Sequence, residues 1–223
     1  MEYEIVGGSM QIVNLKLNQG EKFYVDAGKL VSKSDTVTIN SKLGGGGGLI
    51  KGIMMEASGT SAFLTECTAE GGDGVIALAG VIPGKVKPIE LKEGESIMVE
   101  HFAFLGTNDA SKLQVKSSFR GLLAQAGLFL EQFDGPVTVF LHVCGDVIEY
   151  DLQEGSAVSV DPGHIAAFSS TTMPQFTAIG GIKNALFSGE GLYLARFTGP
   201  AKLYLHSISR LKLEMAVGVR RGK

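Results

Sequence analysis

The sequence predicts an all-β protein, and three observations carry that prediction. Hydrophobic residues make up 44% of the 223 residues and charged residues 19%, a composition typical of folded globular proteins. Apolar and polar residues alternate with a period of two through much of the chain. Glycine occurs 31 times without a fixed period, which predicts many tight turns between short strands.

The alternation is clearest in five short segments, where one side of each strand would face the core and the other the solvent. These segments are VNLKL (13–17), VKPIEL (86–91), VIEYDL (147–152), VSV (158–160) and LKL (211–213). Helical spacing occurs only over about two turns at a time, at 49–57, 119–126 and 181–187. We therefore expect strands joined by short connecting helices.

Two patterns each occur three times along the chain. The first reads strand, L-x-x-G, strand, loop, strand, at 17–35, 91–109 and 152–170, with turn glycines Gly20, Gly94 and Gly155. The second is a strand pair around a turn, at 61–80, 127–145 and 191–209, with Phe63, Phe129 and Tyr193 in register. Such self-similarity predicts an internally repeated fold.

The order of the two patterns predicts how the repeat closes. The chain starts with the first pattern and ends with the second, so two units are complete, at about 44–115 and 117–177. A third, 180–213, would be completed by residues 1–40. We therefore expect a single compact β domain over 1–223 with pseudo-threefold symmetry. Its first strands (2–40) would pack against its last (190–213), leaving no open edge.

Three stretches resemble a known family. They are MEYEIVGGSMQIVNLKLNQGEKFYVDAGKLVSKSD (1–35), VSVDPGHIAAFSS (158–170) and FSGEGLYLARFTGPAKLYLHS (187–207). They resemble a prokaryotic family related to the fungal mitochondrial biogenesis (altered inheritance of mitochondria) proteins. The resemblance implies a double-stranded β-helix fold similar to the tryptophan RNA-binding attenuation protein group. It also implies oligomers, with trimers plausible, no assigned activity and no catalytic residues to carry over.

The chain departs from that family in one motif. The family's Gly-Glu-Gly or Gly-Glu-Ser step before the second pattern is kept only at Gly189-Glu190-Gly191. The first copy has Gly59-Thr60-Ser61 and the second has Gln125-Ala126-Gly127. A shared role for the glutamate is therefore not supported in those two copies.

The four histidines carry no metal-binding motif, since HxH and HExxH are both absent. His142 and His206 hold matching positions in the second pattern, and His101 and His164 hold nearly matching positions in the first. Matching residues could converge on an axis and bind an ion, but strand or rim histidines are the simpler interpretation. We expect no metal and no cofactor.

Nucleophile motifs are also absent. There is no G-x-S-x-G, and Cys67 and Cys144 form no CxxC. Cys144 follows His142 by two residues, so the two would share a strand face, which predicts a core pair rather than a catalytic dyad. The acidic residues lie mainly beside turns, where carboxylates are usually solvated. The sequence therefore favours a non-enzymatic protein and leaves an enzyme with an unrecognised site open.

Charge and hydropathy narrow the class of partner. The net charge is −3 with an isoelectric point near 5.8, and no basic stripe is present beyond the tail VRRGK, so we expect no nucleic-acid partner. The longest uncharged run, 162–182, contains several polar residues and does not predict a membrane span. The opening MEYEIVGGSM has acids where a signal peptide needs bases, which favours a cytoplasmic protein.

Two apolar segments, 48–57 and 120–133, would either form contact surfaces between copies or cover a barrel mouth. The sequence therefore predicts a self-assembling scaffold or interaction protein that forms a homo-oligomer. The alternative is a small-ligand binding protein with a pocket at the pseudo-axis or barrel mouth. The five glycines at 44–48 do not match a phosphate loop and correspond to the longest of three connectors, which predicts slack in the chain.

Overall fold

The computed structural model describes residues 1–40, 64–114, 129–178, 193–209, 212–213 and 216–217, and their fold is antiparallel β throughout. Its strands are β1 (Glu2–Val6), β2 (Ile12–Leu17), β3 (Lys22–Asp26), β4 (Leu30–Lys33), β5 (Val37–Asn40), β6 (Leu64–Ala69), β7 (Gly74–Ala79), β8 (Gly84–Leu91), β9 (Ser96–Glu100), β10 (Phe104–Thr107), β11 (Leu113–Gln114), β12 (Leu130–Asp134), β13 (Val137–Cys144), β14 (Val147–Leu152), β15 (Ala157–Val160), β16 (Ile165–Ser169), β17 (Gln175–Ala178), β18 (Tyr193–Thr198) and β19 (Ala201–His206). Three short 3-10 helices are also described: η1 (His101–Ala103), η2 (Ala110–Lys112) and η4 (Pro162–His164).

The order of strand pairing recurs three times along the chain. Strands β2 to β7 pair as β2-β7-β4 and β5-β6-β3, and we name this group unit 1. Strands β8 to β13 pair in the same way, as β8-β13-β10 and β11-β12-β9, and form unit 2. Strands β14 to β19 pair as β14-β19-β16 and β17-β18-β15, and form unit 3. Strand β1 is an addition that pairs with β2. We count β1 as the first strand and number the strands of every unit from second to seventh, so that β3, β9 and β15 are the third strands, β4, β10 and β16 the fourth, and β7, β13 and β19 the seventh.

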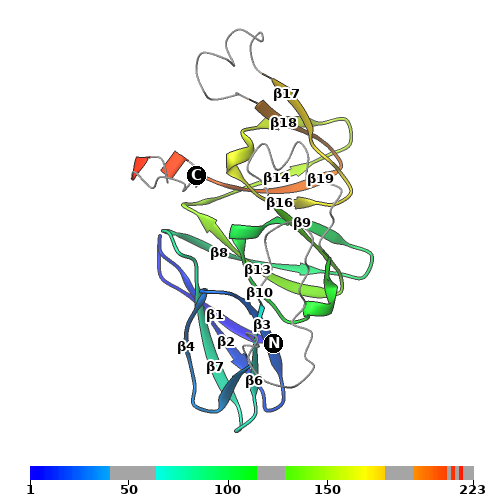
Figure 1. The fold of residues 1–223 in the computed structure, drawn as a ribbon. Coiled ribbons are helices and arrows are strands. Elements are labelled where there is room, and N and C mark those ends of the chain that lie inside the picture. Colours follow the sequence, from blue (N-terminus) through cyan, green and yellow to red (C-terminus); the bar gives the residue numbers. More distant parts are fainter. Residues whose placement is uncertain (41–63, 115–128, 179–192, 210–211, 214–215, 218–223) are drawn as a thin grey trace, which may run out of the picture.

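Neighbouring units are joined by strand pairing. In the first junction β3 of unit 1 pairs with β10 of unit 2, and in the second β9 of unit 2 pairs with β16 of unit 3. Each junction merges half of one unit with half of the next into a six-stranded sheet. The units therefore form a row that runs from β1, β2, β4 and β7 at one end to β17 and β18 at the other (Figure 1).

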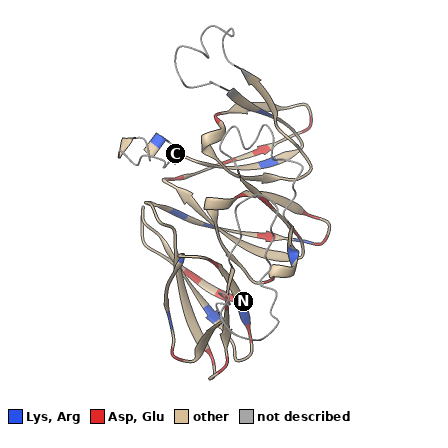
Figure 2. Cartoon of the chain, in the orientation of Figure 1, with Lys and Arg blue, Asp and Glu red and all other residues tan. Residues whose placement is uncertain are grey.

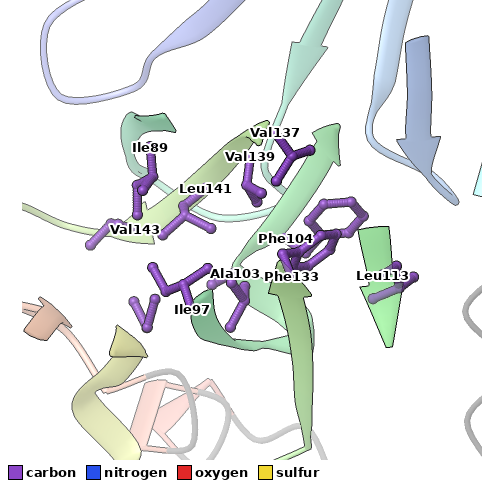
Figure 3. Close-up of a cluster of buried hydrophobic side chains, with 13 residues drawn as sticks. Ile89, Ile97, Ala103, Phe104, Leu113, Phe133, Val137, Val139, Leu141 and Val143 are labelled. Carbon is purple, nitrogen blue, oxygen red and sulfur yellow. The ribbon is translucent and has the colours of Figure 1, made fainter. Parts of the chain in front are cut away.

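Each unit has its own hydrophobic core. The core of unit 2, drawn in Figure 3, joins Ile97 and Phe133 of one half-sheet to Val139 and Leu141 of the other. Strands in the middle of the row are buried on both faces. In β13, Val139 and Leu141 face the core of unit 2, while Phe140 packs into the core of unit 1. This double burial explains why β13 reads VTVFLHVC, a nearly continuous apolar run.

The three predicted turn glycines all adopt the conformation that the turn requires. Gly20, Gly94 and Gly155 have φ of +85°, +83° and +80°, which glycine adopts without a steric penalty. In the first two units the glutamate after the glycine closes the turn: Glu21 Oε2 accepts the Asn18 N–H at 2.8 Å and Glu95 Oε2 accepts the Lys92 N–H at 2.7 Å. These turn-side acids have a structural role.

The prediction of an all-β fold is confirmed, but the expected closure is wrong for the described strands. β18 and β19 pair with β14 to β17 of their own unit, and β1 to β5 pair within unit 1 or with β10. The reason is that β6 and β7 pair with the strands that precede them, so each first pattern joins the second pattern that follows it. The two ends of the row consequently lie apart (Figure 1).

Other expectations have mixed outcomes. Lys212 and Leu213 lie in a helical turn, with the Leu213 N–H bonded to the Ser209 carbonyl, so these residues are not in a strand. The connecting helices at 49–57, 119–126 and 181–187, the pentaglycine 44–48 and Gly189-Glu190-Gly191 lie outside the described residues. Pseudo-threefold symmetry and a double-stranded β-helix like that of the attenuation protein are not confirmed and stay predictions.

Candidate functional site

The turns between the third and fourth strands of the units mark the most polar buried region of the row. They are Asp26–Lys29, Glu100–Ala103 and Asp161–His164, and each begins with an acid. Glu100 Oε2 accepts the Ala103 N–H at 3.1 Å and Asp161 Oδ1 accepts the Gly163 N–H at 2.9 Å, so these two carboxylates cap their 3-10 turns. The first two turns supply a buried acid, Asp26 and Glu100, whereas Asp161 is half-exposed.

The first two turns meet in a group that we name the acid–histidine cluster: Asp26, Lys29, His101, Glu131 and His142. His101 Nδ1 lies 2.8 Å from Glu131 Oε1, and because a carboxylate only accepts, the ring N–H donates. Lys29 Nζ donates to the Phe102 carbonyl at 3.3 Å, which ties unit 1 to unit 2. The cluster therefore forms part of the first junction.

Burial sets the protonation of the carboxyl and imidazole groups. Loss of solvent raises the pKa of Asp26 to about 6, although His101 and Lys29 both act to lower it. The hydrogen bond to Glu131 raises the pKa of His101, against an opposing effect of burial. Burial thus favours the neutral form of Asp26, and the contact with Glu131 favours the protonated form of His101.

His142 lies on the other side of the cluster in an apolar setting. Its ring packs against Gly80 and Gly84, where a Cβ would come within 2.1 Å and 2.8 Å of ring atoms. Burial, followed by the charge of Lys29, lowers the pKa of His142 to about 4, and the Ile82 backbone offsets this only in part. His142 is therefore neutral at physiological pH, and glycine at position 80 leaves room for the ring.

Three buried polar atoms of the cluster have no hydrogen-bond partner among the residues that the structure describes. They are Glu131 Oε2 and the two ring nitrogens of His142. Residue Glu131 is 5% exposed and His142 is 3% exposed. Buried polar groups are normally paired, so these atoms mark a place where water or a small polar molecule would gain hydrogen bonds.

Sequence reasoning singled out His101 and His142 but missed Asp26, Lys29 and Glu131. A signal for Glu131 was present: a strand period of two places it on the same face as Phe133, so burial of the carboxylate followed from the alternation. Comparison of the repeats held a second signal, because the residues equivalent to Glu131 in units 1 and 3 are the uncharged Thr65 and Ala195. Lys29 and Asp26 carried no comparable mark, since their burial depends on contact with the next unit.

The other histidines take part in hydrogen bonds near the third turn. The Cys144 N–H donates to His206 Nδ1 at 2.9 Å, and His164 Nδ1 donates to the His206 carbonyl at 2.8 Å. His142 and His206 do hold equivalent positions, opposite Val86 and Val147. Within the described part of the chain, no three His, Cys, Asp or Glu residues are grouped so as to hold a metal ion.

The cysteines lie in the protein interior. Neither Cys67 nor Cys144 is in a disulfide, and both are buried. Burial raises the pKa of the Cys67 thiol to about 11, so the reactive thiolate is scarce at neutral pH. Within the acid–histidine cluster, Asp26 can gain and lose a proton near pH 6, and the bond from Lys29 to the Phe102 carbonyl links units 1 and 2.

Comparisons with known proteins agree with this fold. The sequence model of the family described as mitochondrial biogenesis AIM24 matches residues 3–208. The chain belongs to this family. An uncharacterized protein of Streptococcus pyogenes serotype M6 is 28% identical over 214 residues, which cover 90% of this chain and 84% of that protein.

A solved structure supports the overall fold of this chain. The crystal structure of a Streptococcus pyogenes protein superposes with a TM-score of 0.78 at 26% identity, covering 97% of each chain. Among the described residues no helix is long and apolar enough to cross a lipid bilayer. Lys and Arg are interspersed with Asp and Glu over the strands (Figure 2).

Proposed function

We propose that this chain is a non-enzymatic scaffold protein that assembles with copies of itself. The observation that carries the proposal is the exposed outer side of unit 1. At the bulge of the fourth strand, Leu105 of unit 2 and Ala166 of unit 3 are each 0% exposed beneath the preceding unit. Val31 holds the same position in unit 1, and its side chain is 59% exposed.

A second exposed valine belongs to the same sheet as Val31. Val75 of β7 is 42% exposed, and it pairs through its backbone with Ser34 just after β4. An apolar side chain such as Val31, exposed at a position that is buried in the other two units, is typical of a contact surface. The charged residues of the acid–histidine cluster bind other residues of the same chain, which favours a role in joining unit 1 to unit 2.

The proposal carries with it a homo-oligomer, for which a trimer is one possible size, a cytoplasmic location and a single domain made of all three units. Native mass spectrometry of the full chain tests it at protein concentrations from below one to tens of micromolar. We expect a defined oligomer whose population rises with concentration by mass action. A monomer throughout that range would contradict the scaffold function.

A second candidate is a small-ligand binding protein, and the unpartnered atoms of Glu131 and His142 favour it. The ligand would be a small polar molecule bound at the first junction, instead of at a pseudo-axis or barrel mouth. A thermal shift screen against polar metabolites tests this, with Glu131→Gln as the variant and Glu149→Gln, on exposed β14, as the control. A compound that raises the melting temperature of the wild type and the control, but not of Glu131→Gln, would support it.

A further inference from the structure

The two ends of the row carry complementary halves of the contact that joins the units. The first junction pairs the outer edge of a third strand, β3, with the outer edge of a fourth strand, β10, and the second junction pairs β9 with β16. Among the described strands, β15 is the third strand of the last unit and ends its sheet, and β4 is the fourth strand of the first unit and ends its own. Within the described strands, one edge of each kind therefore remains unpaired.

We propose that copies of this chain associate head to tail, with β4 of one copy pairing antiparallel to β15 of the next. The inference rests on the proposed scaffold function and names the surfaces that assemble. It extends the pairing that already joins unit 1 to unit 2 and unit 2 to unit 3. A fourth strand from a second copy would occupy β15 as β10 occupies β3.

The shape of β4 supports the pairing. Strands β4, β10 and β16 all have a bulge at the same place, where their register against β7, β13 and β19 shifts. The shifts lie between Leu30 and Ser32, between Phe104 and Gly106, and between Ile165 and Ala167. Strand β4 thus has the backbone irregularity of the two strands that are already engaged at junctions.

The cores of the units support it as well. Leu105 of unit 2 reaches into the core of unit 1, and Ala166 of unit 3 reaches into the core of unit 2. The core of unit 3, built around Phe168 and Phe197, receives no such residue from the described part of the chain. Val31 of a second copy would supply it, and burying this exposed valine would add a favourable hydrophobic contribution.

The internal junctions also fix the register of the pairing. Gly106 faces Val25 and Thr107 faces Tyr24 in the first junction, and Ala167 faces Val99 and Phe168 faces Met98 in the second. The equivalent alignment places Ser32 opposite Val160 and Lys33 opposite Ser159 of the next copy. Because the contact joins two different surfaces, it generates a ring if the rotation closes and an open chain if it does not.

Cysteine cross-linking between copies tests the register. Lys33→Cys and Ser159→Cys, made in separate full-length chains and mixed under mild oxidation, should give a disulfide-linked dimer, since paired Cα atoms lie within disulfide reach. A chain with both changes should give a ladder of covalent oligomers. The native cysteines are buried and should not contribute.

The matched control is Lys33→Cys mixed with Ala157→Cys. Ala157 is exposed on the same face of β15 but lies two residues from the expected partner, about 7 Å along the strand, so we expect at least tenfold less dimer. Equal cross-linking of both mixtures, or none from either, would overturn the proposed pairing. If native mass spectrometry then still shows an oligomer, the scaffold function stands and only the surfaces are wrong.

A second pair of variants tests the same contact without cysteines. Val31→Asp places a charge at a position that would be buried between copies, whereas Val81→Asp places one on a valine that is 71% exposed between β7 and β8. We expect Val31→Asp to raise the concentration for half-maximal association at least tenfold and Val81→Asp to leave it unchanged. An oligomer equally insensitive to both changes would contradict the proposal.

Discussion

The two junctions of the row use the same strand pairing but bury different chemistry. The first junction holds Lys29, His101 and Glu131, and the second has Ala103, Pro162 and Ala195 at the equivalent positions. Only the acid that begins the turn and the histidine of the seventh strand occur in both, as Asp26 with His142 and Glu100 with His206. The second junction thus forms without counterparts of Lys29, His101 and Glu131, and these three charged or polar residues are specific to the first junction.

The largest expected difference between the junctions concerns the aromatic residue that crosses each of them. Phe140 is fully buried in the core of unit 1, with its ring edge-on to Tyr3 and Phe23. We expect Phe140→Ala to lower the free energy of unfolding by about 3–5 kcal/mol, as for other buried phenylalanines. Urea unfolding followed by circular dichroism measures the change.

The matched variant at the second junction is Tyr204→Ala. Tyr204 holds the equivalent position but is only partly buried, and Lys87 Nζ lies 5.6 Å from its ring centre. The loss should be smaller, about 1–3 kcal/mol, because less apolar surface leaves the core. A larger loss for Tyr204→Ala than for Phe140→Ala would show that the second junction is the more tightly packed of the two.

The next effect comes from the turn acids, whose pKa values move in opposite directions. The pKa of Asp26 rises from 3.8 to about 6, so its favourable contribution is complete below pH 3.8 and is lost as the pH rises through 6. The rise corresponds to about 3 kcal/mol at most, so Asp26→Asn should stabilise the protein by up to that amount at pH 8 and by little at pH 3.

Asp161→Asn is the control with the opposite sign. Burial acts to raise the pKa of Asp161, but the hydrogen bonds from Lys212 and Gly163 together lower it. Its contribution is present above the ordinary carboxyl pKa and is lost as the pH falls. We expect Asp161→Asn to destabilise the protein slightly at neutral pH, with an effect that fades in acid. Thermal unfolding from pH 3 to 8 compares the two, and equal pH profiles would contradict the burial of charge at the first junction.

The smallest effect concerns the closest backbone contact of each junction. Gly106 and Ala167 hold equivalent positions in β10 and β16. A Cβ on Gly106 would come within 2.5 Å of the Phe23 ring and 2.7 Å of the Tyr24 carbonyl oxygen, so Gly106→Ala should cost about 1–3 kcal/mol. Ala167→Gly, by contrast, should cost about 1 kcal/mol through added chain entropy. Denaturant midpoints measure both, and a neutral Gly106→Ala would show that the first junction is loosely packed.

Much of the fold could be predicted from the sequence because the information was local. The period of two in VNLKL and VIEYDL, together with Gly20, Gly94 and Gly155, placed strands and turns correctly. The sequence could not show in the same way which strands together form one unit. Both patterns recur in strict alternation, so the sequence does not say whether β6 and β7 join the strands before or after them. Only the hydrogen-bond partners in space decide this.

The candidate site was less predictable for a similar reason. His101 and His142 stood out as residue types, but their environment depends on Lys29 and on glycines 80 and 84, which come from other strands and turns. Lys29 and Asp26 lie at the turn that meets unit 2, where Lys29 Nζ donates to the Phe102 carbonyl. Burial created by a junction leaves no periodic mark in either of the segments that meet.

Hydrogen exchange of the backbone amides gives the most direct test of the claim that the ends of the row continue its internal junctions. Strands β3 and β9, covered by β10 and β16, should be protected at every protein concentration. At concentrations where the protein assembles, Leu30–Lys33 and Ala157–Val160 should become protected as well, and they should lose protection on dilution. An assembled protein in which both of these strands exchange as rapidly as in the dilute chain would contradict the account.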